Sequence, residues 1–476
     1  MTSNAACYDS LITLQLGKAG LPAGRVEVLK NFLGHFAGGI FEIDSHIMHE
    51  RYLLDIRNEF ENTFYEDLTL DFDKLYTSKI LIKDSDDNVS FNDKFILYLF
   101  IGRYFSYVLK RDFPKKYNVQ ISECIKNVRY RSYANILLYS LFFSNDVDVL
   151  EKLVAVLDQK FNHIKKWKLS KDEEVYVSIN RDIFESLEVA DNFRNTRLES
   201  LQKDYSDYQL RGSDKAEGYI SPFSTLSNTL IVSIDDDKPG TFIGDMNSLF
   251  RMQSIIGNAI NTRQGTFKRD IILKCVNSLI RSSGRFAHEN LNQTRKLLGN
   301  LDKAIEQTSN KFPKEDFEYL EEGSEQYTRQ KSSFISAKIQ DEINFHGRWA
   351  IISSQGVLGR VLSQNNTNIA LQELYQKEVK ESKKRDDFNY NYLMAYGISS
   401  LWQSGKINRE FYDTVLEKHG DIGFVRDVLS FSIFVFSRYM PISVKDRQWL
   451  SNKLRMKLQS FRYRQRKLLP KHEKKD

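Results

Sequence analysis

The chain has 476 residues, 41% of them hydrophobic, with 32 Phe, 24 Tyr and only 7 Pro. This length predicts two or three domains with a sizeable core, and this composition favours helices over strand-and-turn folds. The net charge of +6 belongs mostly to the final segment Phe461–Asp476, where seven Lys/Arg face two acids. The body of the chain is therefore electrically balanced, which excludes a protein that is basic throughout.

The cysteines and the apolar stretches indicate the compartment. Cys7, Cys124 and Cys275 lie far apart and form no CxxC pair, which speaks against a disulfide framework and a zinc site and for a reducing environment. The first residues lack the pattern of a secretory signal. Arginines interrupt the stretches Phe95–Leu109 and Val425–Met440, so neither provides the roughly 20 apolar residues of a membrane span. We expect a cytoplasmic protein without a membrane partner.

The first 92 residues predict helices and then a small winged-helix unit. Residues 1–45 form a helical lead-in, broken at Leu21–Gly24 by a Pro–Gly loop. Residues 46–92 predict a helix through Tyr52 and Phe60 and a second one near Leu70–Tyr76. A strand–turn–strand follows, with strands at Ile80–Ile82 and Val89–Phe91.

Residues 93–204 have a helical pattern throughout. The stretch Arg131–Leu157 predicts two short helices, because its apolar residues recur every three to four positions. Ser144 or Asn145 is expected to cap the second helix through its short polar side chain. Neither helix can bury its apolar stripe alone, so the pair must pack against other helices. Trp167 and a helix at Ile179–Leu187 close the block.

The second half of the chain predicts more helices around two polar interruptions. Residues 205–245 form a loop or insert that could hold a hairpin of Leu230–Ile234 and Thr241–Ile243, 246–302 continue the helices, and 303–331 form a linker. Residues 332–459 predict a C-terminal helical domain, and 460–476 form the basic tail. The expected helices of this domain are Phe334–Ser363, Asn368–Lys380, Tyr390–Gly405, Arg409–His419, Phe424–Tyr439 and Val444–Leu458. The predicted fold class is therefore mainly α, a multi-helical array with a small winged-helix unit near the N-terminus.

Motifs for nucleotides and metals are weak. Gly17–Lys18 is followed by Ala19, so no hydroxyl is placed for a magnesium ion. The sequence Asp84, Asp86, Asn88 resembles the start of a calcium loop, but Val89 and Phe95 occupy the positions that need Gly and Glu. We expect a hairpin tip there. The remaining groups are expected to be solvated surface residues: Asp235–Asp237, and the pair His46 and His49.

Two features point towards nucleic acid. Arg281 and His288 match the loose R-x(4–6)-H signature of HEPN ribonucleases, but Ser282 stands where that family favours Asn, Asp or His, and Gly284 should weaken the helix between them. Seven basic residues crowd into the tail and could contact phosphates: Arg462, Arg464, Arg466, Lys467, Lys471, Lys474 and Lys475. In contrast, Asp71 and Asp73 make the expected second helix of the winged-helix unit acidic, which favours a protein contact.

Four stretches carry a resemblance to a known family: Asn31–Phe41, Ile80–Phe105, Ser132–Asp148 and Tyr439–Leu450. Together they resemble the C-terminal half of bacterial STAND NTPases, the NACHT-like antiphage sensors. The first is similar to the helix that enters their winged-helix domain, and the second to their wing and the aromatic helix after it. The third resembles the next helical pair, and the fourth their closing segment.

The resemblance lacks the part that would carry nucleotide chemistry. Members of this family have an effector domain and a nucleotide-binding core ahead of these segments, whereas Met1 falls where that core would end. No Walker motif is present, so no nucleotide-binding residue can be assigned from the resemblance. We expect one half of a split system, a truncated gene product or a stand-alone sensor.

The resemblance implies a non-enzymatic sensor or scaffold module of a STAND-type antiphage defence system. Its partners would be an NTPase or effector subunit and a phage protein that acts as the trigger. We expect no catalytic, cofactor-binding or metal-ligating residue. Two alternatives remain open: a protein that acts on nucleic acid through Arg281 and His288 or through the basic tail, and a truncated remnant of a larger STAND protein.

Overall fold

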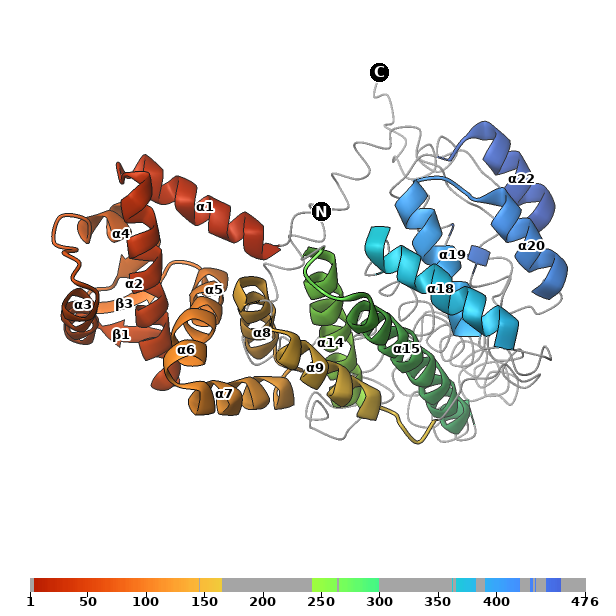
Figure 1. The fold of residues 1–476 in the computed structure, drawn as a ribbon, viewed down its shortest axis with the longest axis horizontal. Helices are drawn as coiled ribbons and strands as arrows, with labels where there is room; N and C mark the ends of the chain where they lie inside the picture. Colours follow the sequence, from red (N-terminus) through yellow and green to blue (C-terminus); the bar gives the residue numbers. More distant parts are fainter. Residues whose placement is uncertain are drawn as a thin grey trace, which may run out of the picture. The chain divides into compact units, whose positions relative to one another are not determined.

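The computed structural model describes residues 4–144, 146–164, 242–262, 265–298, 365–381, 390–419 and 442–454, with 362, 429, 430 and 433 (Figure 1). Of these residues, 78% are helical, and a small three-stranded sheet lies near the N-terminus. The predicted mainly α fold is confirmed. The chain forms two compact units, residues 1–157 with 247–271 and residues 158–246 with 272–476. None of the described helices is long and apolar enough to cross a membrane.

The N-terminal elements have the topology of a winged helix. After α1 (Asn4–Lys18), they run in the order helix, strand, helix, helix, strand, strand. The three strands form an antiparallel sheet in the order β1-β3-β2. Ser90 of β3 lies opposite Ile47 of β1 on one side and Ile82 of β2 on the other. The elements are α2 (Ala23–Glu42), β1 (Ile47–His49), α3 (Glu50–Phe64), α4 (Asp73–Thr77), β2 (Leu81–Lys83) and β3 (Asn88–Phe91).

The core of this winged helix is aromatic and extends beyond residues 46–92. Phe32 of α2 packs with its ring centroid 5.8 Å from that of Phe60 on α3. One helical turn later, Phe36 lies 5.4 Å from Phe91 of β3, which in turn lies 5.7 Å from Phe100. The predicted boundaries at residues 45 and 92 therefore run through one packed core, because α2 and the helix after β3 bury their faces against the sheet.

A helical array continues from β3. Its elements are α5 (Lys94–Tyr104), a π-helical turn η1 (Phe105–Leu109), α6 (Lys110–Asp112), α7 (Pro114–Lys126), α8 (Arg131–Ser144) and α9 (Val147–Gln159). Asp93 caps α5 by accepting a hydrogen bond from the backbone N–H of Phe95 at 2.6 Å. Residues 96–103 of α5 are all buried, as expected of a helix that is apolar on every side. The predicted pair of helices within Arg131–Leu157 is confirmed as α8 and α9.

α5 and α8 approach closely at one glycine. A Cβ atom on Gly102 would lie 2.7 Å from Cβ of Tyr139 and 2.8 Å from the backbone nitrogen of Ser140. Real Cβ atoms do not occur at such distances, so only glycine allows these two helices to meet here. The close approach fixes the position of α8 against the winged helix.

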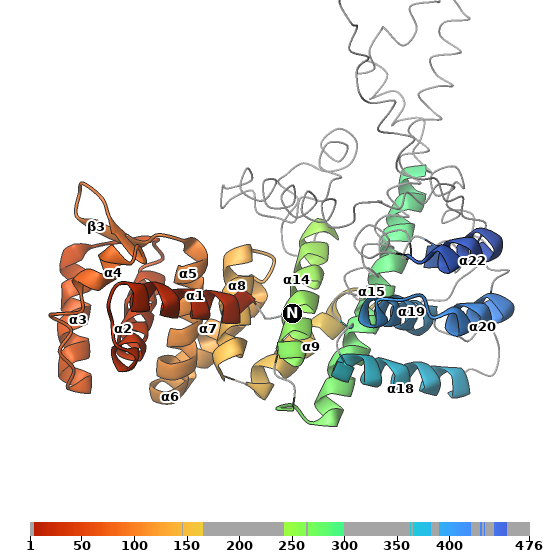
Figure 2. The same ribbon diagram turned by 90° about the horizontal axis from the view of Figure 1, so that it is seen from above.

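The remaining described helices also follow the predicted pattern. Tyr375 of α18 and Tyr396 of α19 stack with centroids 5.2 Å apart, and these two helices lie side by side (Figures 1 and 2). α14 begins at Phe242, so residues 242–245 are helical where the end of a loop with a hairpin strand was expected. The helices are α14 (Phe242–Thr262), α15 (Arg269–Leu298), α18 (Asn365–Glu381), α19 (Tyr390–Ser404), α20 (Arg409–His419) and α22 (Val444–Leu454).

Several predicted segments lie outside the described residues. They are Trp167, the helix Ile179–Leu187, the strand Leu230–Ile234, the linker 303–331 and the basic tail 460–476. Of the predicted helix Phe334–Ser363, only residue 362 is described, and it lies in a turn. Of the predicted helix Phe424–Tyr439, only residues 429, 430 and 433 are described, and these three are helical.

Candidate functional site

The candidate site is the turn between α3 and α4, which corresponds to the turn of a helix-turn-helix. α3 ends at Phe64, and Tyr65 follows in the left-handed conformation with φ of 53°. Its backbone N–H donates to the carbonyl oxygen of Glu61, so the last carbonyl groups of the helix are partly satisfied. The chain then crosses residues 66–72 and enters α4, a helix of five residues.

Arg25, in the first turn of α2, holds this turn in place. Its Nε donates to Asp71 Oδ2 at 2.6 Å, and its Nη1 donates to Glu66 Oε2 at 2.7 Å. Its Nη2 donates to the backbone carbonyl of Asp67. The carboxylates, Asp71 first, raise the pKa of Arg25 above its ordinary value. One planar guanidinium thereby fixes three points of the turn, which a lysine could not do.

Glu61 of α3 holds the turn from the other side. Its Oε1 accepts a hydrogen bond from the backbone N–H of Leu68 at 2.7 Å and another from Arg57 Nε at 2.9 Å. Arg57 also donates to Thr69 Oγ1 at 2.8 Å. The turn is therefore a rigid element, because hydrogen bonds from both α2 and α3 determine its backbone path.

The surface around the turn is strongly acidic. Residues 55–74 contain seven acids and two bases. Both bases are engaged, since Arg57 pairs with Glu61 and Lys74 Nζ donates to the carbonyl of Ala19 at 2.9 Å. Hydrogen bonds from Thr69, side chain and backbone, hold the pKa of Asp67 below its ordinary value. Such a surface repels a phosphate backbone, as the sequence predicted for Asp71 and Asp73.

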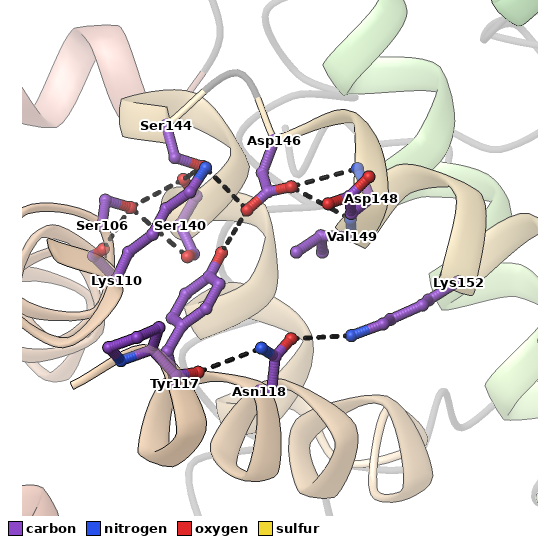
Figure 3. A network of polar contacts seen from close by, with 12 residues as sticks. Ser106, Lys110, Tyr117, Asn118, Ser140, Ser144, Asp146, Asp148, Val149 and Lys152 are labelled. Atoms are coloured by element: carbon purple, nitrogen blue, oxygen red, sulfur yellow. Dashed lines mark hydrogen bonds and ion pairs between the residues drawn. The ribbon is translucent and has the colours of Figure 1, made fainter.

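A second polar cluster lies where α6, α7, α8 and α9 meet (Figure 3). Tyr117 Oη donates to Asp146 Oδ2 at 2.8 Å, and Lys110 Nζ lies 2.8 Å from the same oxygen. Asp146 Oδ1 accepts from the backbone N–H groups of Asp148 and Val149 at 3.0 and 3.3 Å. This carboxylate therefore caps α9 and joins it to α6 and α7.

The cluster corrects the predicted cap of α9. Ser144 instead donates to the carbonyl of Ser140 at 2.9 Å, within α8. Asn145 lies outside the described residues. Burial by itself would raise the pKa of Asp146, but the hydrogen bonds from Lys110 and Tyr117 hold it below its ordinary value. Every group in the cluster is thus used to hold helices together, and Tyr117, with a pKa raised by burial, is a poor base.

The candidates for metal binding have structural roles. Asp84 Oδ1 accepts from the backbone N–H groups of Asp86 and Asn88 at 2.9 and 2.8 Å, which confirms the predicted hairpin tip. His46 and His49 are exposed, as expected, and His49 Nδ1 caps α3 by accepting from the N–H of Arg51. No group of three or more His, Cys, Asp or Glu that could hold a metal ion occurs in the described part of the chain.

Arg281 and His288 lie on one continuous helix, α15. Gly284 lies inside this continuous helix and is buried there. Seven positions correspond to about two helical turns, so the two residues share a face and are about 10 Å apart along the axis. Arg281 is exposed, and His288 Nδ1 lies 3.2 Å from Asn292 Nδ2. The described residues show no direct contact between them.

None of the three cysteines forms a disulfide bond. Cys7 is exposed, whereas Cys124 and Cys275 are buried. Burial raises the pKa of Cys124 to about 12, so this thiol is not a nucleophile at neutral pH. Gly17 and Lys18 end α1, and Asp235–Asp237 and the basic tail lie outside the described residues.

Comparisons with known proteins add no functional assignment. No family model matches this sequence, and no curated protein or solved structure matches it either. The sequence predictions also missed Arg25 and Tyr65 as members of the site. The run of acids from Glu66 to Asp73 was the one signal in the sequence that pointed to this turn.

Proposed function

We propose that this chain is a non-enzymatic sensor or scaffold module of a STAND-type bacterial antiphage defence system. Its winged helix would bind an NTPase or effector subunit supplied by another chain, and its helical domains would bind a phage protein as the trigger. The observation that carries the proposal is the acidic, rigid turn in front of α4, at the place where a DNA-binding winged helix needs a basic reading element.

Three features support protein binding over DNA reading. α4 has only five residues, Asp73 stands in its first turn, and Lys74 is engaged with the carbonyl of Ala19. A reading helix needs side chains that neutralise phosphates and reach base edges, and this helix offers neither. The order of a winged helix followed by a helical array is also the arrangement that the family resemblance implies.

The test is co-purification with the product of a neighbouring gene that carries a Walker motif. We expect a complex between the full chain and that NTPase, and no ATP or GTP binding by the chain alone in calorimetry. Duplex DNA and RNA serve as competing partners in a salt titration. Strong, salt-sensitive binding to nucleic acid without an NTPase complex would contradict the proposal in favour of the nucleic-acid alternative.

A further inference from the structure

Three apolar side chains are exposed on the turn between α3 and α4. Tyr65 is 99% exposed, Leu70 86% and Phe64 37%. Single exposed apolar residues are common on protein surfaces, whereas these three lie within seven residues of one rigid turn. Among the residues that the structure describes, the side chains of Tyr65 and Leu70 form no hydrogen bond or ring contact. We call these three residues with Asp67 and Asp73 the turn face.

The fold does not explain why tyrosine stands at position 65. This residue has φ of 53°, the left-handed conformation in which a side chain is strained and glycine or asparagine is the usual choice. A fully exposed ring adds no burial to offset that strain. Tyrosine is, however, among the residues that contribute most to protein–protein contacts.

The turn face is already ordered for binding. Arg25 and Glu61 determine its backbone through the hydrogen bonds described above, and Asp67 Oδ1 accepts from the N–H of Thr69 at 2.8 Å. A partner would therefore not have to order this loop, which removes much of the entropic cost of association.

The charge of the region indicates what it binds. Glu61 pairs with Arg57, and Glu66 and Asp71 share Arg25, but Asp55, Glu59, Asp67 and Asp73 have no ion pair among the described residues. A partner surface that is complementary to this one carries Lys or Arg beside apolar groups. An arginine of the partner could also stack on the Tyr65 ring.

On a second copy of the chain, the corner at α6 and α7 offers a poor complement to the turn face. The exposed basic corner at α6 and α7 has apolar Phe113, but its cations are mostly neutralised. Arg111 pairs with Asp112, Lys116 with Glu42 and Lys126 with Glu123. Lys115 is the one exposed cation there without an ion pair among the described residues.

We propose that the turn face docks a basic, partly apolar segment of a partner protein. This inference rests on the proposed function, in which the winged helix contacts protein. The partner segment would place one apolar side chain between Tyr65 and Leu70 and direct its cations to Asp67 and Asp73. Phe64 would form the wall on the side of α3.

A displayed library of random peptides, selected on the immobilised full chain, tests the site without knowledge of the partner. We expect the enriched peptides to combine Lys or Arg with aromatic or aliphatic residues. Synthetic peptides from this set should bind at least tenfold more weakly to Tyr65→Gly, to Leu70→Ala and to the double variant Asp67→Lys/Asp73→Lys. Tyr65→Gly removes the ring while it suits the left-handed backbone, so its loss of binding cannot be attributed to unfolding.

Two matched variants control for general effects of exposure and charge. Tyr52→Ala removes another exposed ring from α3, and Asp86→Lys reverses an exposed charge on the hairpin tip. Both should bind the peptides as the unaltered chain does. Peptides without basic residues, or equal loss of binding in the controls, would overturn the site. If the NTPase complex still forms in that case, the proposed function stands and its contact lies elsewhere.

Two other occupants of the turn face, the chain's own basic tail and a second copy of the chain, would give different experimental results. If removal of residues 461–476 made peptide binding much tighter, the occupant of the turn face would be the chain's own basic tail. That result would contradict the proposal of a partner protein. Light scattering would detect a second copy as association that depends on concentration. If Asp67→Lys/Asp73→Lys abolished this association, the occupant would be a second copy and the proposal of a partner protein would be contradicted. Peptide binding at the turn face without any NTPase complex would leave the site standing and refute the proposed STAND role.

Discussion

Arg25 Nε lies 2.6 Å from Asp71 Oδ2, although the two residues are 46 positions apart in the chain. This contact joins the first turn of α2 to the turn in front of α4. It makes the acidic surface of the winged helix a rigid feature rather than a loose loop, because the same guanidinium also binds Glu66 and the backbone of Asp67. The site therefore depends on a residue outside the helix-turn-helix itself.

Removal of this clamp should destabilise the protein. We expect Arg25→Ala to lower the free energy of unfolding by about 1–2 kcal/mol, since three charge-assisted hydrogen bonds at partly exposed groups are lost. Arg25→Lys should recover only part of this, because an ammonium cannot reach all three acceptors. Denaturant unfolding measures the effect. Arg51→Ala, at an exposed arginine of α3, is the control and should change stability by less than about 0.5 kcal/mol.

Substitution of Asp146 should destabilise the protein more than substitution of most other polar residues. Its side chain is only 6% exposed. Asp146→Ala removes the cap of α9 and leaves the buried hydroxyl of Tyr117 without its acceptor, so we expect a loss of about 3 kcal/mol. Tyr117→Phe removes only the hydrogen bond and should cost about 1 kcal/mol. A double-mutant cycle measures the coupling, and additive effects would show that the two residues do not form one unit.

His35 should make stability depend on pH. Its ring lies 5.3 Å from Phe60 and 5.5 Å from Phe64, and burial, followed by the charge of Arg111, lowers its pKa below the ordinary 6.5. The unfolded chain therefore binds a proton more readily than the folded one. The stability that the neutral ring provides is complete above pH 6.5 and is lost as the pH falls through the lowered folded-state pKa.

Thermal unfolding between pH 7 and pH 5 tests this effect. We expect the melting temperature of the unaltered chain to fall across this range, and His35→Phe to reduce that fall. His46→Gln, at an exposed histidine, is the control and should leave the pH dependence unchanged. An equal fall in His35→Phe and the unaltered chain would assign the pH dependence to other groups.

Gly102 should not tolerate a methyl group. Because the added Cβ would lie 2.7 Å from Cβ of Tyr139, Gly102→Ala must separate α5 from α8, and we expect a loss of about 3 kcal/mol. Gly17→Ala is the matched control, since Gly17 lies in α1 with nothing within 4 Å of the added atom. That change should stabilise the protein by about 0.5–1 kcal/mol, as expected for a helical glycine in open space. Similar behaviour of both variants in urea unfolding would contradict the close contact.

Local patterns in the sequence predicted most of the described helices. The pair α8 and α9 follows from apolar residues that recur every three to four positions, and the hairpin follows from two short apolar runs around Asp84–Asn88. The acidity of the turn before α4 was also visible, because it depends only on residue types. Strand β1 was missed, since its three residues are too few to show an alternating pattern. The cap of α9 was assigned to Ser144 or Asn145, whereas Asp146 has the partners that fix its orientation.

The sequence by itself determined that this protein is mainly helical, that a small sheet lies near its N-terminus and that its expected reading helix is acidic. Each of these properties is local, since it depends on residues within one or two turns of each other. Only the tertiary structure decided that Arg25 clamps the turn before α4, that Gly102 lets α5 meet α8, and that Tyr65 and Leu70 remain outside. These properties arise from contacts between residues far apart in the chain, and a single sequence contains no periodicity that reports such contacts.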